Sequence, residues 1–287
     1  MADQGPFLST LTGSFSRPAG DNPTVAMVEA AYRHHGLDAR YLNCDVTPDG
    51  LADAVRGAAA MGWAGFNCSI PHKITVLDHL DELAESARLI GAVNCVVRRG
   101  GRWVGENTDG QGFVTALDGV VDLSGARMVV LGAGGAARAV AVESALAGAT
   151  SVAVVSRSAG PGEDLAAVLN GLPGTTSEHV PWVGDLRLTD ALGGDVDVLV
   201  NATSIGLGDA SARVPLDLAT VPTSCVVADV VPNPPRTRLL RESAERGCGT
   251  VDGLGMLVAQ AARAIQLWTG LDPEHAVMRE ALAKILH

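Results

Sequence analysis

The fold of this chain is decided by the stretch RMVVLGAGGAARAVAVESAL, residues 127–146. It begins with a short apolar run typical of a buried strand, and a helix is expected after the glycines. Between the two, Gly132, Gly134 and Ala137 match the pattern G-x-G-x-x-[G/A]. The first glycine permits a tight turn, the second lets the backbone approach a pyrophosphate, and the small third residue lets the helix pack on the strand. The stretch therefore predicts the phosphate-binding turn of a Rossmann-type domain.

The same turn and the next predicted strand indicate the cofactor. A helix N-terminus offers free N–H groups and a positive dipole end to phosphates. We therefore expect cofactor contacts from Gly132, Ala133, Gly134, Gly135 and Ala136. The second strand ends in Ser156, Arg157 and Ser158, without the carboxylate that binds the ribose 2′-hydroxyl of NAD. Because Arg157 can donate charge-assisted hydrogen bonds to a 2′-phosphate and the serines can add donors, NADP is predicted. The alternative is that Arg157 is a solvated loop residue.

Outward from this stretch, short strand-like runs alternate with helical ones, which is typical of an α/β fold. A chain of 287 residues is long enough for two domains. We place a nucleotide-binding domain at residues 107–238, where four buried strands are expected. The flanks, residues 1–106 and 239–287, remain for a second domain.

Polar side chains gather in three segments before and at the start of the nucleotide-binding domain. The segments are NCSIPHK at 67–73, GAVNC at 91–95 and GENTDG at 105–110. Each follows a predicted strand, and ligands of open α/β sheets bind at the carboxyl ends of strands. Asn supplies both donors and acceptors, so convergent Asn side chains suit a substrate rich in hydroxyls.

These segments resemble the shikimate dehydrogenases, whose patterns are N-V-T-x-P-x-K, G-A-V-N-T and N-T-D-G-x-G. Downstream, residues 132–137 resemble the family's G-A-G-G-A-A, residues 201–206 its N-A-T-S-x-G, and residues 253–260 its G-x-G-M-L-x-x-Q. The resemblance covers nearly the whole chain. It implies an open, twisted α/β substrate-binding domain built from 1–106 and 239–287, with the C-terminal helices returning to it.

The resemblance also implies roles for single residues. Lys73 and Asp109 become the catalytic pair of an NADP-dependent alcohol dehydrogenase, which fits a ketone reduction, because a protonated Lys can stabilise the developing oxyanion and donate the proton. The alternative for both is an exposed residue at a helix start. The implied substrate-binding residues are Ser14, Ser16, Asn67, Ser69, Asn94, Asn107 and Gln260. Further cofactor-binding residues are Asn201, Thr203, Ser204 and Gly253.

The chain departs from the family where the substrate carboxylate is bound. Family members open with G-x-P-x-x-H-S-x-S-P, whereas this chain has Ser14 and Ser16 without the His. Pro232 stands where the family has a tyrosine. Reduction of 3-dehydroshikimate to shikimate remains the leading prediction, with quinate, aminoshikimate or an uncharged cyclitol as alternatives. Arg17 is either a replacement carboxylate ligand or a solvated loop residue.

Composition and charge argue against several other classes of protein and partner. The net charge of -11 and the lack of a basic cluster argue against nucleic acid as a partner. The five cysteines, without a C-x-x-C pair, indicate reduced thiols, and the first residues lack a signal peptide, so a cytoplasmic protein is predicted. No apolar run is long enough for a membrane span, and the seven histidines show no metal-ligand spacing. We expect a monomer or homodimer. Two other classes stay open, a non-catalytic NADP-binding sensor and a glutamyl-tRNA reductase, although the latter needs a reactive Cys.

Overall fold

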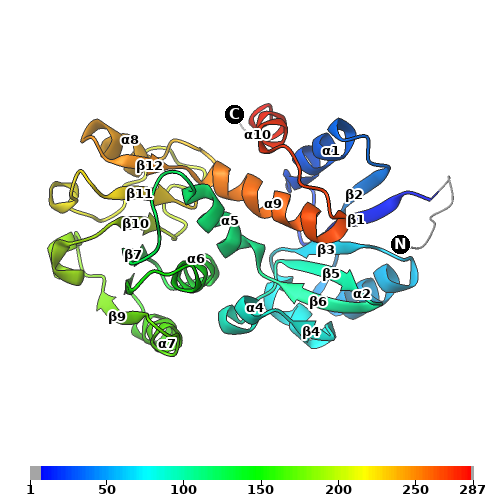
Figure 1. Cartoon of the computed structure of the whole chain (residues 1–287), viewed down its shortest axis with the longest axis horizontal. Helices are drawn as coiled ribbons and strands as arrows, with labels where there is room; N and C mark the ends of the chain where they lie inside the picture. Colours follow the sequence, from blue (N-terminus) through cyan, green and yellow to red (C-terminus); the bar gives the residue numbers. More distant parts are fainter. Residues whose placement is uncertain (1–7, 286–287) are drawn as a thin grey trace. The chain divides into compact units, whose positions relative to one another are not determined.

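A computed structural model describes residues 8–285, so the first residues, on which the signal-peptide prediction rests, lie outside the described part. The chain divides into two compact units. Unit 1 comprises residues 1–108 and 260–287, and unit 2 comprises residues 109–259. Each unit holds one six-stranded sheet, and Figure 1 labels many of the strands and helices.

Unit 1 is built on a mixed sheet with the strand order β2-β1-β3-β5-β6-β4. Its strands are β1 (Thr10–Ser16), β2 (Ala39–Asp45), β3 (Gly65–Cys68), β4 (Glu82–Leu83), β5 (Cys95–Arg99) and β6 (Arg102–Glu106). The first three run parallel, so β1, β2 and β3 end at the same edge. Strand β5 is antiparallel to both β3 and β6. The helices wholly inside unit 1 are α1 (Thr24–His34), α2 (Leu51–Ala60), α3 (His72–Thr75), α4 (Glu85–Ile90) and α10 (His275–Ala283).

One face of this sheet carries an aromatic core. The rings of Phe15 and Phe66 stack with 4.3 Å between centroids, and Trp103 meets Phe66 edge-on. On the opposite face, Trp268 of helix α9 (Gly253–Thr269) packs on the sheet, and its indole N–H donates to the carbonyl of Val96 at 2.9 Å. A Cβ at Gly65 would lie 2.2 Å from the indole nitrogen, so only glycine fits there. This packing holds the second half of α9 in unit 1.

Unit 2 is a parallel sheet with the strand order β12-β11-β10-β7-β8-β9. When these strands are numbered one to six in chain order and read from β9 to β12, they have the 3-2-1-4-5-6 order of a dinucleotide-binding domain. The strand order reverses between β7 and β10, which is the switch point. The strands are β7 (Arg127–Leu131), β8 (Ser151–Ser156), β9 (Thr176–Pro181), β10 (Val198–Asn201), β11 (Val226–Asp229) and β12 (Gly249–Val251). The helices are α5 (Thr108–Leu117), α6 (Gly135–Leu146), α7 (Ala159–Asn170) and α8 (Arg238–Glu245), with α5 starting one residue before the division.

The C-terminal boundary of this unit differs from the sequence-based one. Strand β12 pairs with β11, and α8 lies beside both (Figure 1). Residues 249–251 therefore extend the nucleotide-type sheet, and residues 239–259 belong to unit 2 and not, as predicted from the sequence, to the second domain. The reason is that β12 is only three residues long and two of the three are exposed, so it carries no apolar run that marks a strand.

Candidate active site

The glycine turn of unit 2 has the backbone that its sequence pattern requires. Gly132 has φ +112°, and a Cβ there would lie 3.0 Å from the carbonyl oxygen of Ala202. Helix α6 starts at Gly135 with Gly134 as its N-cap, and no side chain caps it. A Cβ at either position would find no atom within 4 Å, so open space lies before the free N–H groups of the helix. The turn fits a pyrophosphate.

A cavity of about 240 Å³ continues from this turn along the end of β8. It is lined by Gly132, Ala133, Gly134, Ser156, Arg157, Ser158, Pro161, Trp182 and Thr203. Seven of these nine were predicted as cofactor ligands, and Pro161 and Trp182 were not. The guanidinium of Arg157 makes no hydrogen bond or ion pair within residues 8–285. The shape and donor set of the cavity fit the adenosine 2′-phosphate end of NADP.

A buried carboxylate supports the other wall of this cavity. Asp229, which is 2% exposed, accepts hydrogen bonds from the side chains of Asn201 (3.0 Å) and Thr237 (2.8 Å) and from the Val231 N–H (3.0 Å). Asn201 in turn accepts from the backbone and hydroxyl of Thr203. Asn201 therefore holds Thr203 at the cavity, while its own side chain is fully buried.

The remaining predicted cofactor residues lie outside the cavity lining. They are Gly135, Ala136, Asn201, Ser204 and Gly253. A Cβ at Gly253 would lie 2.4 Å from the carbonyl of Val231, so this glycine permits close packing of two backbones.

In unit 1, Asn94 joins three of the predicted substrate segments. Its Oδ1 accepts from the Thr108 N–H at 2.7 Å, and its Nδ2 donates to Thr108 Oγ1 at 3.0 Å and to Gln260 Oε1 at 3.4 Å. Asn107 donates from Nδ2 to the carbonyl of Ala92 at 3.1 Å. Asn94, Asn107 and Gln260 are all buried. The structure thus brings together residues that lie far apart in the sequence.

Lys73 lies half-buried in the short helix α3, beside the same segments. Its carbonyl accepts from the Val93 N–H at 2.8 Å, which fixes the backbone next to Asn94. Burial raises the pKa of the Cys68 thiol, and the nearby Lys73 ammonium opposes that rise. Asp109 follows Thr108 directly, half-buried in the first turn of α5.

The carboxyl end of β1 carries a set of hydrogen bonds that sequence reasoning missed. Ser14 Oγ donates to Asn43 Oδ1 at 3.0 Å and accepts from Asn22 Nδ2 at 3.1 Å. Asn43 also donates to the carbonyl of Asn22. We call these three residues the serine–asparagine triangle. The alternation of Tyr41, Asn43 and Asp45 along β2 was the signal that could have found it.

Two predicted substrate residues beside this triangle differ in their partners. Asn67 accepts from the Tyr41 hydroxyl at 2.9 Å and donates to the carbonyl of Asn94 at 3.0 Å. Ser16 is 3% exposed, and its hydroxyl has no hydrogen-bond partner among residues 8–285. A buried hydroxyl without a partner is rare, so Ser16 is the free donor at this end of the site. Ser69 lies next to α3, and its N–H donates to the carbonyl of Phe15.

Arg17 is held by a carboxylate of its own unit. Its Nη1 lies 3.2 Å from Asp45 Oδ1, and both side chains are about half exposed. Such a pair contributes little to stability, but it places the negative charge of the Asp45 carboxylate beside the Arg17 guanidinium.

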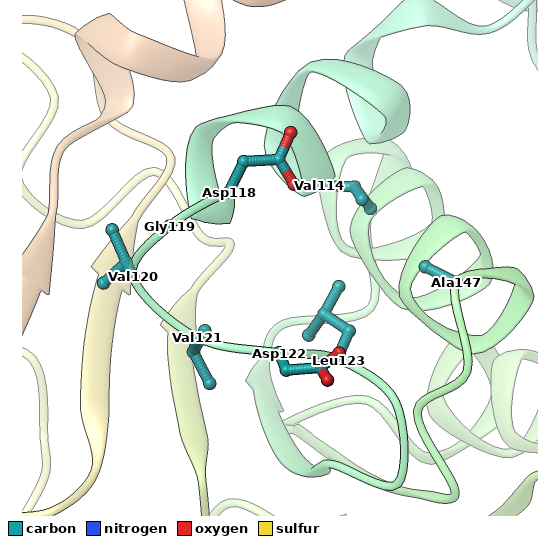
Figure 2. Close-up of a pocket in the computed structure, with 8 residues that line it drawn as sticks. All are labelled: Val114, Asp118, Gly119, Val120, Val121, Asp122, Leu123 and Ala147. Carbon is teal, nitrogen blue, oxygen red and sulfur yellow. The ribbon is translucent and has the colours of Figure 1, made fainter.

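A larger cavity, of about 580 Å³, lies elsewhere in unit 2 (Figure 2). It is lined by Val114, Asp118, Gly119, Val120, Val121, Asp122, Leu123 and Ala147, none of which is a predicted site residue. The segment 118–126 enters β7 at the opposite end from Gly132. The larger of these two cavities is therefore not the one lined by the predicted cofactor residues.

Neither a membrane-spanning helix nor a metal-binding cluster is found among the described residues. No helix within 8–285 is long and apolar enough to cross a bilayer. The same part of the chain contains no group of three His, Cys, Asp or Glu side chains that could hold a metal ion.

Comparison with known proteins places this chain in a family. The family model for the shikimate dehydrogenase substrate binding domain matches residues 16–96, and that for the shikimate 5′-dehydrogenase C-terminal domain matches residues 253–283. NADP(+)-dependent shikimate dehydrogenases of Shouchella clausii and Methanopyrus kandleri are 40% and 41% identical, over 94% and 97% of this chain and 96% of each relative. The chain belongs to the shikimate dehydrogenase family. The predicted family and α/β fold class are confirmed, and members of this family are oxidoreductases.

Three solved structures illustrate what this chain is similar to. The ligand-free 5-ketofructose reductase of Gluconobacter sp. strain CHM43 is 56% identical with a TM-score of 0.94, covering 97% of this chain and 99% of the other. Shikimate 5-dehydrogenase of Listeria monocytogenes, in complex with shikimate and NAD, is 30% identical with a TM-score of 0.88 and 96% coverage of both chains. Quinate dehydrogenase of Corynebacterium glutamicum, in complex with NAD, is 31% identical with a TM-score of 0.86, covering 96% of this chain and 99% of the other.

Proposed function

We propose that this chain is an NADP-dependent oxidoreductase that reversibly reduces a ketone of a small polyhydroxylated substrate to a secondary alcohol. Family membership and the names of the curated relatives support this reaction and cofactor, as predicted from the sequence. The observation that carries the choice of substrate is the serine–asparagine triangle at the end of β1. It favours a neutral substrate, with 5-ketofructose as the first candidate and 3-dehydroshikimate as the second.

The residues near Asn94 supply the chemistry that the chain itself performs. When bound, NADPH supplies the hydride. The Lys73 ammonium stabilises the negative charge that develops on the ketone oxygen and donates the proton. Asp109 is the second member of the proposed catalytic pair, as the family resemblance implies. Asn107 and Gln260 bind substrate hydroxyls through their side-chain amides. Asn94 holds Thr108 and Gln260 in place, since its Oδ1 accepts and its Nδ2 donates within the protein.

The triangle explains why a carboxylate is disfavoured. A serine hydroxyl has one donor, and Ser14 gives its own to Asn43. Arg17 is already paired with the Asp45 carboxylate, so a substrate carboxylate at Arg17 would be repelled by that negative charge. Ser16 leaves one neutral donor, which suits a substrate hydroxyl but does not offset the desolvation of a carboxylate. 5-Ketofructose is neutral, and the reductase of that name is 56% identical to this chain.

The second candidate, 3-dehydroshikimate, rests on a separate observation. The curated relatives at about 40% identity are shikimate dehydrogenases, and the Listeria monocytogenes structure holds shikimate. The residues around Asn94 are the part of the site that both candidates would share.

A substrate comparison separates the two candidates. With saturating NADPH, we expect kcat/KM for 5-ketofructose to exceed that for 3-dehydroshikimate by at least about tenfold, because an unpaired carboxylate loses binding energy in the transition state. The Asp45→Asn variant frees Arg17 and should improve kcat/KM for 3-dehydroshikimate alone. Asp38→Asn, which removes a similar exposed pair with Arg40, is the matched control. A parent enzyme that prefers 3-dehydroshikimate would refute the neutral-substrate proposal.

The proposed cofactor contact gives a second prediction. Arg157→Ala should weaken NADP⁺ binding about tenfold or more and leave NAD⁺ binding nearly unchanged, because a hydrogen bond to a charged group contributes roughly 1.5–3 kcal/mol. Calorimetric titration of both cofactors measures this. Arg187→Ala, a change at another arginine outside the cofactor cavity, is the control. Equal affinity of the parent enzyme for the two cofactors would contradict the assignment.

The predicted cytoplasmic location, the absence of nucleic-acid and membrane partners and the monomeric or dimeric state stay predictions. A small hydroxylated substrate is the one partner class that the family supports.

A further inference from the structure

A hydrogen-bond relay lies behind the turn that carries Arg157. Ser156 Oγ lies 2.8 Å from the carbonyl oxygen of Ser158 and 3.1 Å from Nε2 of His179. A carbonyl only accepts, so the single hydroxyl proton of Ser156 points to Ser158. Ser156 must then accept from His179, which fixes a proton on Nε2. The relay therefore runs from His179 through Ser156 to the Ser158 carbonyl.

The imidazole ring of His179 is closely packed in this position. His179 is on β9, opposite Val154 of β8. A Cβ at Gly162 of α7 would lie 2.3 Å from Cδ2 of the ring and 2.6 Å from Ser156 Oγ. The absence of a side chain at Gly162 thus gives the ring its place, and the ring cannot turn toward the helix. Neither His179 nor Gly162 lines the cofactor cavity.

The relay and a neighbouring backbone hydrogen bond hold two parts of the cavity lining. The Ser158 carbonyl belongs to the residue after Arg157, and Ser158 is the N-cap of α7. The Ser156 carbonyl accepts from the Trp182 N–H at 3.0 Å, which holds the opposite wall. Because the Arg157 guanidinium has no partner among the described residues, its direction depends on this backbone.

We propose that His179 is a positioning residue for cofactor selection, which aims Arg157 at the 2′-phosphate of NADP through Ser156. The inference rests on the proposed contact of Arg157. NAD carries a hydroxyl where NADP carries the 2′-phosphate, so loss of the relay weakens NADP binding selectively. A residue with a merely structural role would affect both cofactors alike.

Calorimetric titration of the full chain with NADP⁺ and NAD⁺ tests this directly, without turnover. His179→Phe keeps a ring of similar size but removes the donor, and it should raise the Kd for NADP⁺ about three- to tenfold, with less than about twofold change for NAD⁺. His179→Gln restores an amide donor near the Nε2 position and should recover most of the affinity. His179→Val, which suits a strand and also removes the donor, serves if His179→Phe does not fold.

The outcomes are distinct. Selective loss in His179→Phe or His179→Val, with recovery in His179→Gln, supports the proposal. Unchanged NADP⁺ affinity in folded variants, equal losses for both cofactors, or no recovery with Gln overturns it. Arg157→Ala separates failure of the proposed phosphate contact from failure of the His179 proposal. Unchanged cofactor preference in Arg157→Ala refutes the phosphate contact itself.

Discussion

Replacing Lys73 with Ala is expected to lower kcat at least about 10²-fold, the lower range for a positioned acid or base. The ammonium is the proposed proton donor, and the ketone oxygen would lose both its charge stabilisation and its proton. The fold should survive, because the contact of Lys73 with Val93 uses its backbone carbonyl, which Ala retains. Steady-state kinetics and thermal melts of the same preparations measure the two properties.

The chain offers a matched control, since Lys73 and Lys284 are its two lysines. Lys284 is exposed and pairs with Glu280 at 2.8 Å, and Lys284→Ala should leave kcat unchanged. Lys73→Arg keeps the positive charge but supplies a group that does not release its proton near neutral pH, so it should remain strongly impaired. A folded Lys73→Ala enzyme with parental kcat would refute the mechanism.

The second large effect is expected on stability. Asp229→Ala leaves buried donors of Asn201, Thr237 and Val231 without their acceptor. An unsatisfied buried polar group costs about 1–3 kcal/mol, so the network should lose roughly 3 kcal/mol in total. For a protein of this size, that corresponds to a fall in Tm of roughly 6–12 °C. Ser211→Ala, which removes an exposed hydroxyl bonded to Asp209, is the control and should change Tm little. A Tm equal to that of the parent would show that the network contributes nothing.

The same carboxylate should have a pH signature. Burial raises the pKa of Asp229, against the opposing effect of its hydrogen bonds. Between the unfolded and folded pKa values the folded chain binds more protons, so this group favours folding as pH falls through its folded pKa. Asp229→Asn removes that proton uptake. The Tm of the parent relative to that of Asp229→Asn should therefore rise as the pH is lowered from about 7 to about 4.5. A relative fall would mean that the ionised form is the one that the fold stabilises.

Local patterns predicted those features of the fold that depend on neighbours in the sequence. Gly132, Gly134 and Ala137 predicted a strand, a tight turn and a helix because each glycine answers a backbone requirement within that turn. The missing carboxylate after β8 predicted NADP, which the curated relatives support. The apolar strands of unit 2 were found because continuous burial leaves a continuous apolar run.

Residues recruited across strands escaped prediction for a physical reason. His179 reaches Ser156 because β9 pairs beside β8, and Asn43 reaches Ser14 because β2 pairs beside β1. A single polar side chain in a strand carries no mark of the partner that the register will give it. Strand β12 was missed because its three residues are too few for a periodic signal.

The sequence by itself determined the family, the α/β class, the nucleotide turn and the identity of the polar segments around Asn94, since these follow from motifs that are contiguous in the chain. Tertiary structure alone decided how those groups are satisfied. Ser14 and Ser16 read alike in the sequence, yet packing gives Ser14 two asparagine partners and leaves Ser16 buried with none. A hydroxyl that already donates within the protein is lost to a ligand, and only the position of its neighbours in space settles which hydroxyl that is.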